Sequence, residues 1–316
     1  MKAVLLDTGR PVSCRPLTCT RALADCPVAN RPLADWQRER LAAAGFSPAG
    51  AEAPGGAVLR VQGDAWISPA AFRQMAHADR AAVLRDAAGE VLAWIGEADG
   101  VSPGAAELAA DSGSFRICYP WDLLRVNESL LGALDRDEVE GDVSPAAHIE
   151  GRLVLGRGSR ILPGVYVEGN VMIGAGCKVG PNCYLRGSTS IGDGCHIGQA
   201  VEIKNSILMA RVSIGHLSYC GDSIIGEGVN FGAGTITANF RHDGKAHRSM
   251  VEGVLVDTGR RKFGTIMGDG VHTGIHTSIY PGRKFWPGVQ TRPGEIVQRD
   301  VAEAEAGKTA AGSGGL

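Results

Sequence analysis

The chain has 316 residues, of which 44% are hydrophobic and 21% charged, with a formal net charge of −2 and a pI near 6.5. This length allows two domains, and the charge balance argues against a nucleic-acid-binding protein. There is no run of 18 apolar residues and no cleavage signature after the first apolar stretch, so neither a membrane span nor a signal peptide is predicted. The eight cysteines form no CxxC pair, which favours reduced thiols in a cytoplasmic protein over a disulfide framework.

Residues 1–120 have the mixed patterning of an α/β domain. Apolar runs of four or five residues predict strands, and longer segments with helical periodicity predict helices. A loop rich in Ala, Gly and Pro separates two of them at 43–57. The predicted strands are Ala3–Leu6, Val58–Val61, Ala82–Leu84 and Val91–Ile95, and the predicted helices are Leu33–Ala44 and Ala70–His77.

The opening stretch MKAVLLDTGRPVSCRPLTCTRALADCPVANRP resembles the start of the sugar-1-phosphate nucleotidylyltransferases. That family begins with a strand, a GxGTRLRPLT loop and PKPLLPVANKP, and the two align without a gap. The resemblance implies a nucleotidylyltransferase-like fold for this domain. The matching residues are Gly9, Arg15, Pro16, Leu17, Thr18, Pro27, Val28, Ala29, Asn30 and Pro32.

The departures from this signature fall on the residues that phosphate chemistry needs. Pro11 replaces the loop's second glycine, Ser13 its arginine, and Leu23 the family's catalytic lysine. Holding a triphosphate takes backbone N–H groups and cations. Pro11 removes one N–H, and Ser13 and Leu23 supply no charge. Asp64 resembles the family's metal-binding aspartate, but a loop aspartate capping the following helix is the alternative. We therefore expect a shortened, degenerate domain over 1–120, kept for structure or assembly.

The stretch YPWDLLRVNESLLGAL predicts a connecting helix within a linker at 121–139. Its aromatic residue is expected to pack between the domains. The residues that share one face of this helix are Trp121, Leu124, Asn127 and Leu131.

Beyond the linker, aliphatic residues recur every six positions. This period fits neither a helix face nor an alternating strand, and it is typical of a left-handed parallel β-helix in which three hexads make one coil. The period shortens by one residue twice, and the β-helix is predicted over 140–297. The inward positions are Val143, Ile149, Leu155, Ile161, Val167, Ile173, Val179, Leu185, Ile191, Ile197, Ile203, Leu208, Ile214, Cys220, Ile225, Phe231, Thr237, Met267, Thr273, Ile279 and Phe285.

Two segments break the hexad pattern. Residues 240–265 carry a dense basic run and no hexad, so we expect a protruding loop. Residues 298–316 lack large apolar side chains in their interior, and we expect a disordered tail.

The run VEIKNSILMARVSIGHLSYCGDSIIGEGVNFGAGTITAN at 201–239 resembles the acetyltransferase domain of the bifunctional enzyme that makes UDP-N-acetylglucosamine. The linker YPWDLL and residues 240–297 are more similar to the archaeal type of these two-domain proteins. The resemblance implies N-acetylation of an amino-sugar 1-phosphate, glucosamine first and galactosamine second, with acetyl-CoA as co-substrate and without a metal.

The resemblance also implies roles for five residues. His216 corresponds to the catalytic base, Arg186 and Lys204 to the phosphate-binding cations, and Tyr219 and Asn230 to sugar contacts. A histidine suits proton removal from an amine near pH 7. The two cations are one coil apart, so they stack ~4.8 Å from each other, and a shared anion would relieve their repulsion. A corner histidine bonded to a carbonyl, two solvated cations and ordinary polar wall residues are the alternatives.

The acetyl end is expected at the GAGTITAN run. The resemblance implies that Asn239 orients the acetyl group, and an asparagine ladder stabilising a corner is the alternative. Gly232, Ala233 and Gly234 would let the thioester arm approach the backbone, and amides of this corner would hold the oxyanion. The family's later CoA contacts are not matched, because Ile275 and Pro293 stand there, and Lys245 matches the family's loop lysine only loosely. The run Arg260, Arg261 and Lys262 would hold the 3′-phosphate of CoA or form a solvated turn.

Three other functions are weighed against this one. A nucleotidylyltransferase and a non-catalytic scaffold remain alternatives, since a hexapeptide prism supports several functions. A carbonic-anhydrase-like zinc site is not favoured, because the available histidines do not stack one coil apart on one wall. They are His196, His216, His242, His247, His272 and His276. We expect a homotrimer with the active site in the groove between copies, acting in nucleotide-sugar biosynthesis.

Overall fold

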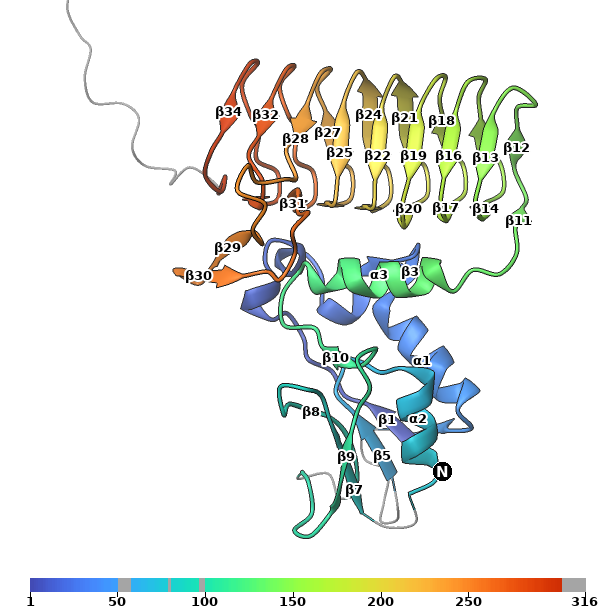
Figure 1. Ribbon diagram of the computed structural model, residues 1–316, viewed down its shortest axis with the longest axis vertical. Coiled ribbons are helices and arrows are strands. Elements are labelled where there is room, and N and C mark those ends of the chain that lie inside the picture. Colours follow the sequence, from blue (N-terminus) through green and yellow to red (C-terminus); the bar gives the residue numbers. More distant parts are fainter. Residues whose placement is uncertain (51–57, 79–80, 97–99, 303–316) are drawn as a thin grey trace, which may run out of the picture.

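A computed structural model describes residues 1–50, 58–78, 81–96 and 100–302. An α/β domain stands against one side of a long three-sided prism of parallel strands, with a helix lying between them (Figure 1). This arrangement confirms the predicted fold class. Among the described residues, no helix is long and apolar enough to cross a membrane.

The N-terminal domain is built on a six-stranded mixed sheet with the order β4-β1-β5-β8-β7-β9. Strands β5 and β8 have the predicted bounds, and the other predicted elements differ by one or two residues. Strands β4 and β9 were missed, because the first has two residues and the second, AELA, has only a weak apolar alternation. The elements are β1 Lys2–Leu5, β4 Ser47–Pro48, β5 Val58–Val61, β7 Ala82–Arg85, β8 Val91–Ile95, β9 Ala106–Ala109, α1 Leu33–Ala43 and α2 Pro69–Ala76.

Short elements surround this sheet. Two-residue strands form two small antiparallel ladders, and three 3₁₀ turns carry the signature stretch of the first 30 residues. The turns are Val12–Cys14, Leu17–Cys19 and Leu23–Asp25, and the paired strands are β2 Pro27–Val28 with β3 Arg31–Pro32 and β6 Ala65–Trp66 with β10 Phe115–Arg116.

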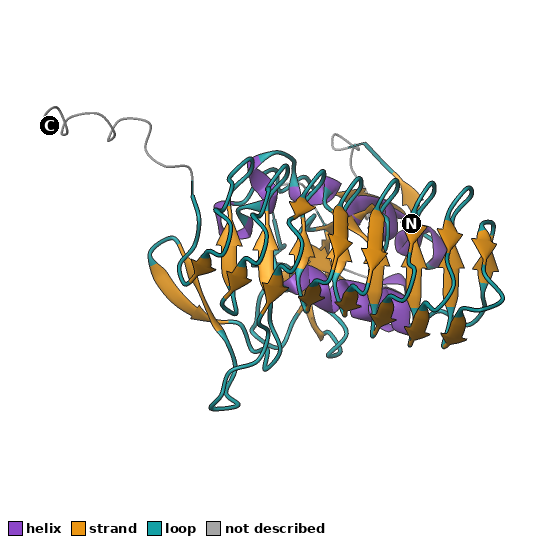
Figure 2. Ribbon diagram, turned by 90° about the horizontal axis from the view of Figure 1, so that it is seen from above, coloured by secondary structure: helices purple, strands orange, loops and turns teal. Residues whose placement is uncertain are grey.

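The prism has three faces of parallel strands, which stack side by side along its axis (Figure 2). We call the first the docked face, because the N-terminal domain lies on it. Its strands are β11 Glu138–Val139, β14 Leu153–Leu155, β17 Val171–Ile173, β20 Thr189–Ile191, β23 Ile207–Leu208, β26 Ile224–Ile225, β31 Thr265–Met267 and β33 Arg283–Phe285.

The other two faces are turned away from that domain. The second face holds β12 Asp142–Val143, β15 Arg160–Ile161, β18 Lys178–Val179, β21 His196–Gln199, β24 Ser213–His216 and β27 Asn230–Phe231. The third face holds β13 His148–Glu150, β16 Tyr166–Glu168, β19 Tyr184–Arg186, β22 Glu202–Lys204, β25 Tyr219–Gly221, β28 Ile236–Thr237, β32 Ser278–Ile279 and β34 Ile296–Val297.

The hexad positions fill the interior of the prism, as predicted. From Leu155 to Phe285 every one of them is buried, and only Val143 and Ile149 of the first coil are half-exposed. The two shortened hexads remove one residue from the same corner on successive coils, between the third and the docked face. Asn205 and Asp222 take left-handed φ angles of 47° and 51° at this corner. The two places where the sequence period shortens therefore correspond to this corner of the prism.

The helix α3, Asp122–Gly132, lies between the domains, and its predicted face is buried. The Trp121 ring meets Phe263 edge-on at 5.7 Å in a cluster that also contains Ile207 and Ile224 of the docked face. Asn127 accepts from the Ala29 amide at 3.0 Å and donates to the Ser188 carbonyl at 2.8 Å.

The segment between β28 and β31 is not a plain loop. It contains a hairpin of β29, Arg248–Val251, and β30, Val254–Asp257, that projects from the prism (Figure 1). Residues 298–302, expected in the tail, pack on the last coil, since Val301 donates to the Lys284 carbonyl at 2.8 Å. The rest of the expected tail lies outside the described residues.

Candidate functional site

Arg186 and Lys204 are direct partners in the ladder of the third face, one coil apart, as the 18-residue spacing predicts. Each occupies the last position of its strand, and their side chains are 35% and 21% exposed. The outward position on the next strand is Gly221. The place that a side chain of Gly221 would take is filled by the Tyr219 hydroxyl and by Nδ2 of Asn239, so the two cations border these two side chains.

The two cations do not depend on a shared external anion, so that part of the sequence argument is wrong. Arg186 Nη2 lies 2.6 Å from Glu202 Oε1, and Lys204 Nζ lies 2.8 Å from Asp222 Oδ2. Both carboxylates belong to the motif VEIK…GD, but no role was assigned to them from the sequence. A buried or half-buried cation keeps its charge most easily beside such a partner.

Asp222 is the centre of this network, and only 3% of its side chain is exposed. Besides Lys204, it accepts from Asn205 Nδ2 at 3.1 Å and from Asn239 Nδ2 at 2.6 Å. Asn205 also donates to Glu128 of α3 at 2.8 Å. One carboxylate thus ties the wall of the prism to the helix between the domains.

Tyr219 and Asn239 belong to the same network. Asn239 Nδ2 donates to the Tyr219 hydroxyl at 2.8 Å as well as to Asp222. Burial, and secondarily the charge of Asp222, raises the pKa of Tyr219 to about 12, so this phenol stays protonated at neutral pH. Asn239 is bonded to side chains rather than stacked in an asparagine ladder.

His216 is the last residue of β24, at the corner between the second and third faces. Its side chain is exposed, and the ring makes no hydrogen bond within the described residues, unlike a histidine bonded to a carbonyl. The corner itself is held by its backbone, since the His216 carbonyl accepts from Ser218 Oγ at 2.7 Å and from the Gly234 amide at 3.1 Å. Asn230 begins β27, one coil further along the second face.

Four of the amides of the GAGTIT corner are already engaged. The amides of Gly232, Gly234 and Ile236 donate to carbonyls of neighbouring coils, and that of Thr235 donates to the Gly232 carbonyl. The two glycines are needed for stacking. A Cβ on Gly232 would lie 2.5 Å from the Gly274 backbone, and Gly234 has φ +74°. The predicted backbone oxyanion hole is therefore not present at these four amides.

The three residues of the basic run after the hairpin make three different contacts. Arg260 forms an ion pair with Glu128, so it is not a free phosphate ligand. Arg261 Nε donates to the Gly244 carbonyl at 3.1 Å, and Lys262 Nζ lies 3.9 Å from the centre of the Phe240 ring.

Comparisons with known proteins also match this chain to proteins that contain an acetyltransferase. A family profile described as the GMPPB C-terminal domain matches residues 167–281. The "bifunctional sugar-1-phosphate nucleotidylyltransferase/acetyltransferase" of Sulfurisphaera tokodaii is 42% identical over 59% of this chain and 46% of its own length. The "bifunctional protein GlmU" of Methanococcus maripaludis C7 is 54% identical over 54% of this chain and 41% of its own length.

This chain resembles the bifunctional nucleotidylyltransferase/acetyltransferase proteins. It spans less than half the length of these two relatives. Among solved structures, the acetyltransferase domain of PglB from Neisseria gonorrhoeae FA1090 overlaps 90% of this chain and 94% of its own, with 14% identity and a TM-score of 0.21.

The N-terminal domain contains the residues at which the sequence departs from the nucleotidylyltransferase signature. Leu23, at the position of the lysine, is completely buried in the cluster between the domains. Asp64 caps no helix: its Oδ2 forms an ion pair with Arg116, and α2 begins with Ser68, whose hydroxyl accepts from the Ala71 amide at 3.0 Å. Within the described ranges, no group of three or more His, Cys, Asp or Glu side chains is placed to hold a metal ion.

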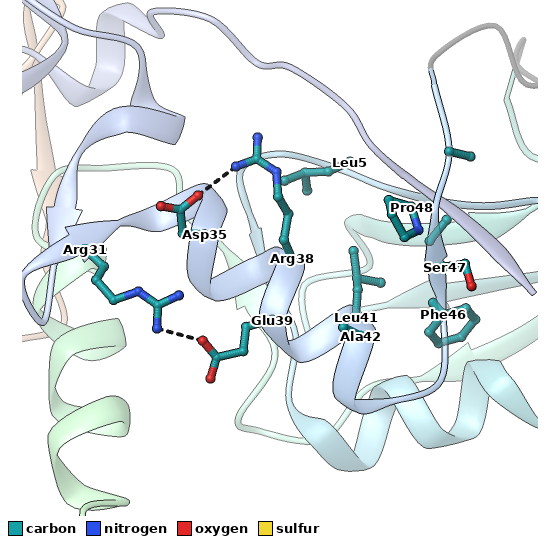
Figure 3. A pocket seen from close by; sticks show the side chains of 12 residues that line it. Leu5, Arg31, Asp35, Arg38, Glu39, Leu41, Ala42, Phe46, Ser47 and Pro48 are labelled. Carbon is teal, nitrogen blue, oxygen red and sulfur yellow. Dashed lines mark hydrogen bonds and ion pairs between the residues drawn. The ribbon is translucent and has the colours of Figure 1, made fainter.

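The same domain has a hollow of about 600 Å³ beside α1, which the sequence did not indicate. Leu41, Phe46 and Pro48 form its apolar side (Figure 3). Two ion pairs stand at its polar side, Arg31 with Glu39 at 2.6 Å and Arg38 with Asp35 at 2.8 Å. Each cation there is matched by a carboxylate, so the hollow has no excess positive charge for a phosphate.

Proposed function

We propose that this protein transfers the acetyl group of acetyl-CoA to the amine of an amino-sugar 1-phosphate. The observation that supports this most is the position of His216 at one edge of the third face, exposed and with no hydrogen bond to its ring from the part of the chain that the structure describes. Arg186 and Lys204 stand at the other edge of the same three-residue-wide face. A ligand lying across the face would present its amine to the histidine and its phosphate to the cations.

The chemistry assigned to these residues is a nucleophilic acyl transfer. The amine attacks the thioester carbonyl, so that a C–N bond forms while His216 accepts the proton of the amine. The C–S bond then breaks, and the proton passes to the departing CoA thiolate. Asn239 would steady the tetrahedral oxyanion once its amide leaves the Tyr219 hydroxyl, because the four corner amides are already used.

Binding the phosphate requires the two ion pairs of the site to rearrange. A dianionic phosphate would compete with Glu202 for the bidentate guanidinium of Arg186, which is partly exposed, and would share Lys204 with Asp222. Since Lys204 has a nearly buried partner and Arg186 does not, we expect Arg186 to move toward the ligand and Lys204 to stay in place.

We further propose that three copies form a ring around the active sites. Arg160 and Lys178 stand outward on the second face, and Glu150 and Glu168 stand outward on the third. None of the four has an ion-pair partner within the described residues. A head-to-tail contact between unlike faces closes into a ring, and the grooves between copies would then contain His216.

One assay tests the reaction directly. Release of free CoA from acetyl-CoA would be followed with glucosamine 1-phosphate, galactosamine 1-phosphate and the two amino sugars without phosphate. We expect release with at least one phosphorylated sugar and much less with the free sugars. No release with any of them would favour the non-catalytic scaffold.

A second assay separates the rival activity. With magnesium, UTP or dTTP, and N-acetylglucosamine 1-phosphate, we expect no pyrophosphate above background, because Leu23 and the Asp64–Arg116 pair replace the groups that the reaction needs. Robust pyrophosphate release would mean that the N-terminal domain has kept its activity through other residues.

A further inference from the structure

The base of the β29–β30 hairpin forms a basic cleft. Its larger part is a hollow of about 460 Å³, and a smaller one of about 230 Å³ shares lining residues with it. Both hollows are lined by the same three arginines, Arg241, Arg248 and Arg283. They come from three segments, the start of the excursion, β29 and β33, so that the cleft exists only in the folded protein.

The positive charge of this cleft is only partly neutralised by the protein. Within the part of the chain that the structure describes, neither Arg248 nor Lys245 nor Arg283 has a carboxylate at ion-pair distance. Arg283 donates instead to the carbonyls of Pro281 and Gln298, at 3.3 and 3.2 Å. Four cations thus face two carboxylates in the larger hollow.

Those two carboxylates are already occupied. Asp243 holds Arg241 through two bonds of 2.9 and 2.6 Å, and this contact keeps the pKa of Asp243 well below its usual range. Asp257 accepts from the Gly259 amide at 2.9 Å. An anion entering the cleft would therefore meet Arg248, Lys245 and Arg283 without displacing a carboxylate from them, unlike the phosphate at Arg186.

An aromatic pocket of about 570 Å³ opens beside these arginines. Phe240 and Tyr280, 44% and 49% exposed, line it together with Pro281, and Arg241 lines this pocket as well as both hollows. Exposed aromatic rings next to unpaired arginines are the elements that hold a flat base and the phosphate attached to it. The volumes of this pocket and of the larger hollow fall in the range of small-molecule sites.

From these observations we propose that the cleft binds a nucleoside phosphate, with the base against Phe240 and Tyr280 and the phosphate among Arg241, Arg248 and Arg283. Of the basic run, Arg260 is held away from the cleft by Glu128, whereas Lys262 Nζ lies 3.9 Å from the centre of the Phe240 ring and would give way to the base on that side or leave it the other face of the ring.

The position of the cleft allows two sources for this ligand. Tyr280 stands in the same outward column of the third face as Lys204, three strands further along the prism, which corresponds to about 14 Å. The ligand is then either the nucleotide end of the acyl donor of the proposed reaction, or a separate nucleotide that binds next to the active site. Only the first of these rests on the proposed function.

Calorimetric titration of the full chain with adenosine 3′,5′-bisphosphate tests the proposal without requiring turnover, and uridine diphosphate serves as the second probe. We expect one of them to bind, and Arg248→Ala to weaken that binding at least tenfold. Phe240→Ala should weaken it too, whereas adenosine or uridine alone should bind far more weakly. Arg157→Ala, which removes a guanidinium that is 87% exposed on the prism, is the matched control and should leave binding unchanged.

Repeating the titration with saturating acetyl-CoA separates the sources. Loss of binding identifies the acyl donor's nucleotide end, and retained binding identifies a separate nucleotide. Arg248 has no side-chain partner in the described part of the chain, so its substitution should leave the thermal unfolding temperature unchanged. The proposal is overturned if neither probe binds the folded wild-type protein at millimolar concentration, or if Arg248→Ala and Arg283→Ala both bind as wild type does. Neither result would bear on whether acetyl transfer occurs.

Discussion

Lys204 Nζ lies 2.8 Å from Asp222 Oδ2, and the two residues stand at the same prism corner on successive coils. This ion pair belongs to the candidate site, and it lies at the corner whose shape follows from the shortened period of the sequence. Without the deletion of one residue per coil, the side chain of Asp222 would not stand at this place in the corner.

Removing the charge of Asp222 should destabilise the protein. Asp222→Asn keeps the volume but leaves Lys204 without its counter-ion and puts an amide among three donors, so we expect a loss of about 1.5–3 kcal/mol in the free energy of unfolding. Urea unfolding measures this loss. Glu140→Gln, which removes a 65% exposed carboxylate 3.9 Å from Arg157, should change stability by less than about 0.5 kcal/mol. Equal effects of the two substitutions would contradict the role given to Asp222.

Replacing His216 by Ala should reduce acetyl transfer by about 10²–10⁴-fold, since the reaction loses its general base. Its exposed side chain makes no hydrogen bond within the described residues, so the unfolding temperature should not change. His148→Ala provides a control, because His148 is also exposed on the prism but lies at its first coil. Near wild-type turnover of the His216 variant at neutral pH would remove this residue from the mechanism.

Arg186→Ala should raise the KM for the amino-sugar phosphate by about 10- to 100-fold and leave that for acetyl-CoA nearly unchanged. The reason is the loss of a charge-assisted contact worth about 1.5–3 kcal/mol. Steady-state kinetics with each substrate varied in turn measures the difference. If the protein acetylates the free amino sugar as well as its phosphate, the two cations have another role.

Charge reversal tests the proposed ring of three copies. Glu150→Lys together with Glu168→Lys would place like charges opposite Arg160 and Lys178 of the neighbouring copy, so we expect light scattering to show dissociation to single chains. Reversing Arg160 and Lys178 to Glu in the same chain should restore the ring. Unchanged mass in the first variant would show that these rows do not face each other.

The free energy of unfolding should depend on pH through the ionisation of Asp122. Burial, opposed by bonds from the Tyr119 and Cys118 amides, raises the pKa of Asp122 from 3.8 to about 6. A raised folded-state pKa favours the folded state below pH 4, and this contribution is lost as the pH rises through 6. Asp122→Asn should therefore gain stability relative to wild type between pH 4 and 7, by no more than about 3 kcal/mol. A difference that does not vary with pH would exclude this group.

The sequence allowed the prism to be predicted almost residue by residue, because its period acts on every coil. The ladder partnership of Arg186 and Lys204 followed from the same spacing. Glu202 and Asp222 were missed as their partners, since a period shows which coil a residue occupies and not which way its side chain turns. The hairpin was missed because only four residues per strand and no hexad mark it.

The roles of the N-terminal residues could be predicted only in part from the sequence. Leu23 could be recognised as unable to act as a lysine, but its burial against the prism depends on Trp121 and the docked face, which lie far away in the sequence. Asp64 was given two interpretations, metal ligand and helix cap. The cap is wrong, since Ser68 caps α2, and no group of three or more metal-ligating side chains lies within the described residues. The ion-pair partner of Asp64, Arg116, is 52 positions away, and nothing in the sequence connects them.

The way the N-terminal domain lies on the prism has a consequence for how the protein comes apart. In a coiled prism each coil touches only its neighbours, so that unravelling starts easily at either end. Here Asn30 donates to the Ile191 carbonyl, Asn127 to that of Ser188, and Arg21 reaches Asp269, so one domain fastens several coils together. Amide hydrogen exchange should be slowest in the fastened coils and fastest in the first coil, at β11 to β13, which would fray before the others.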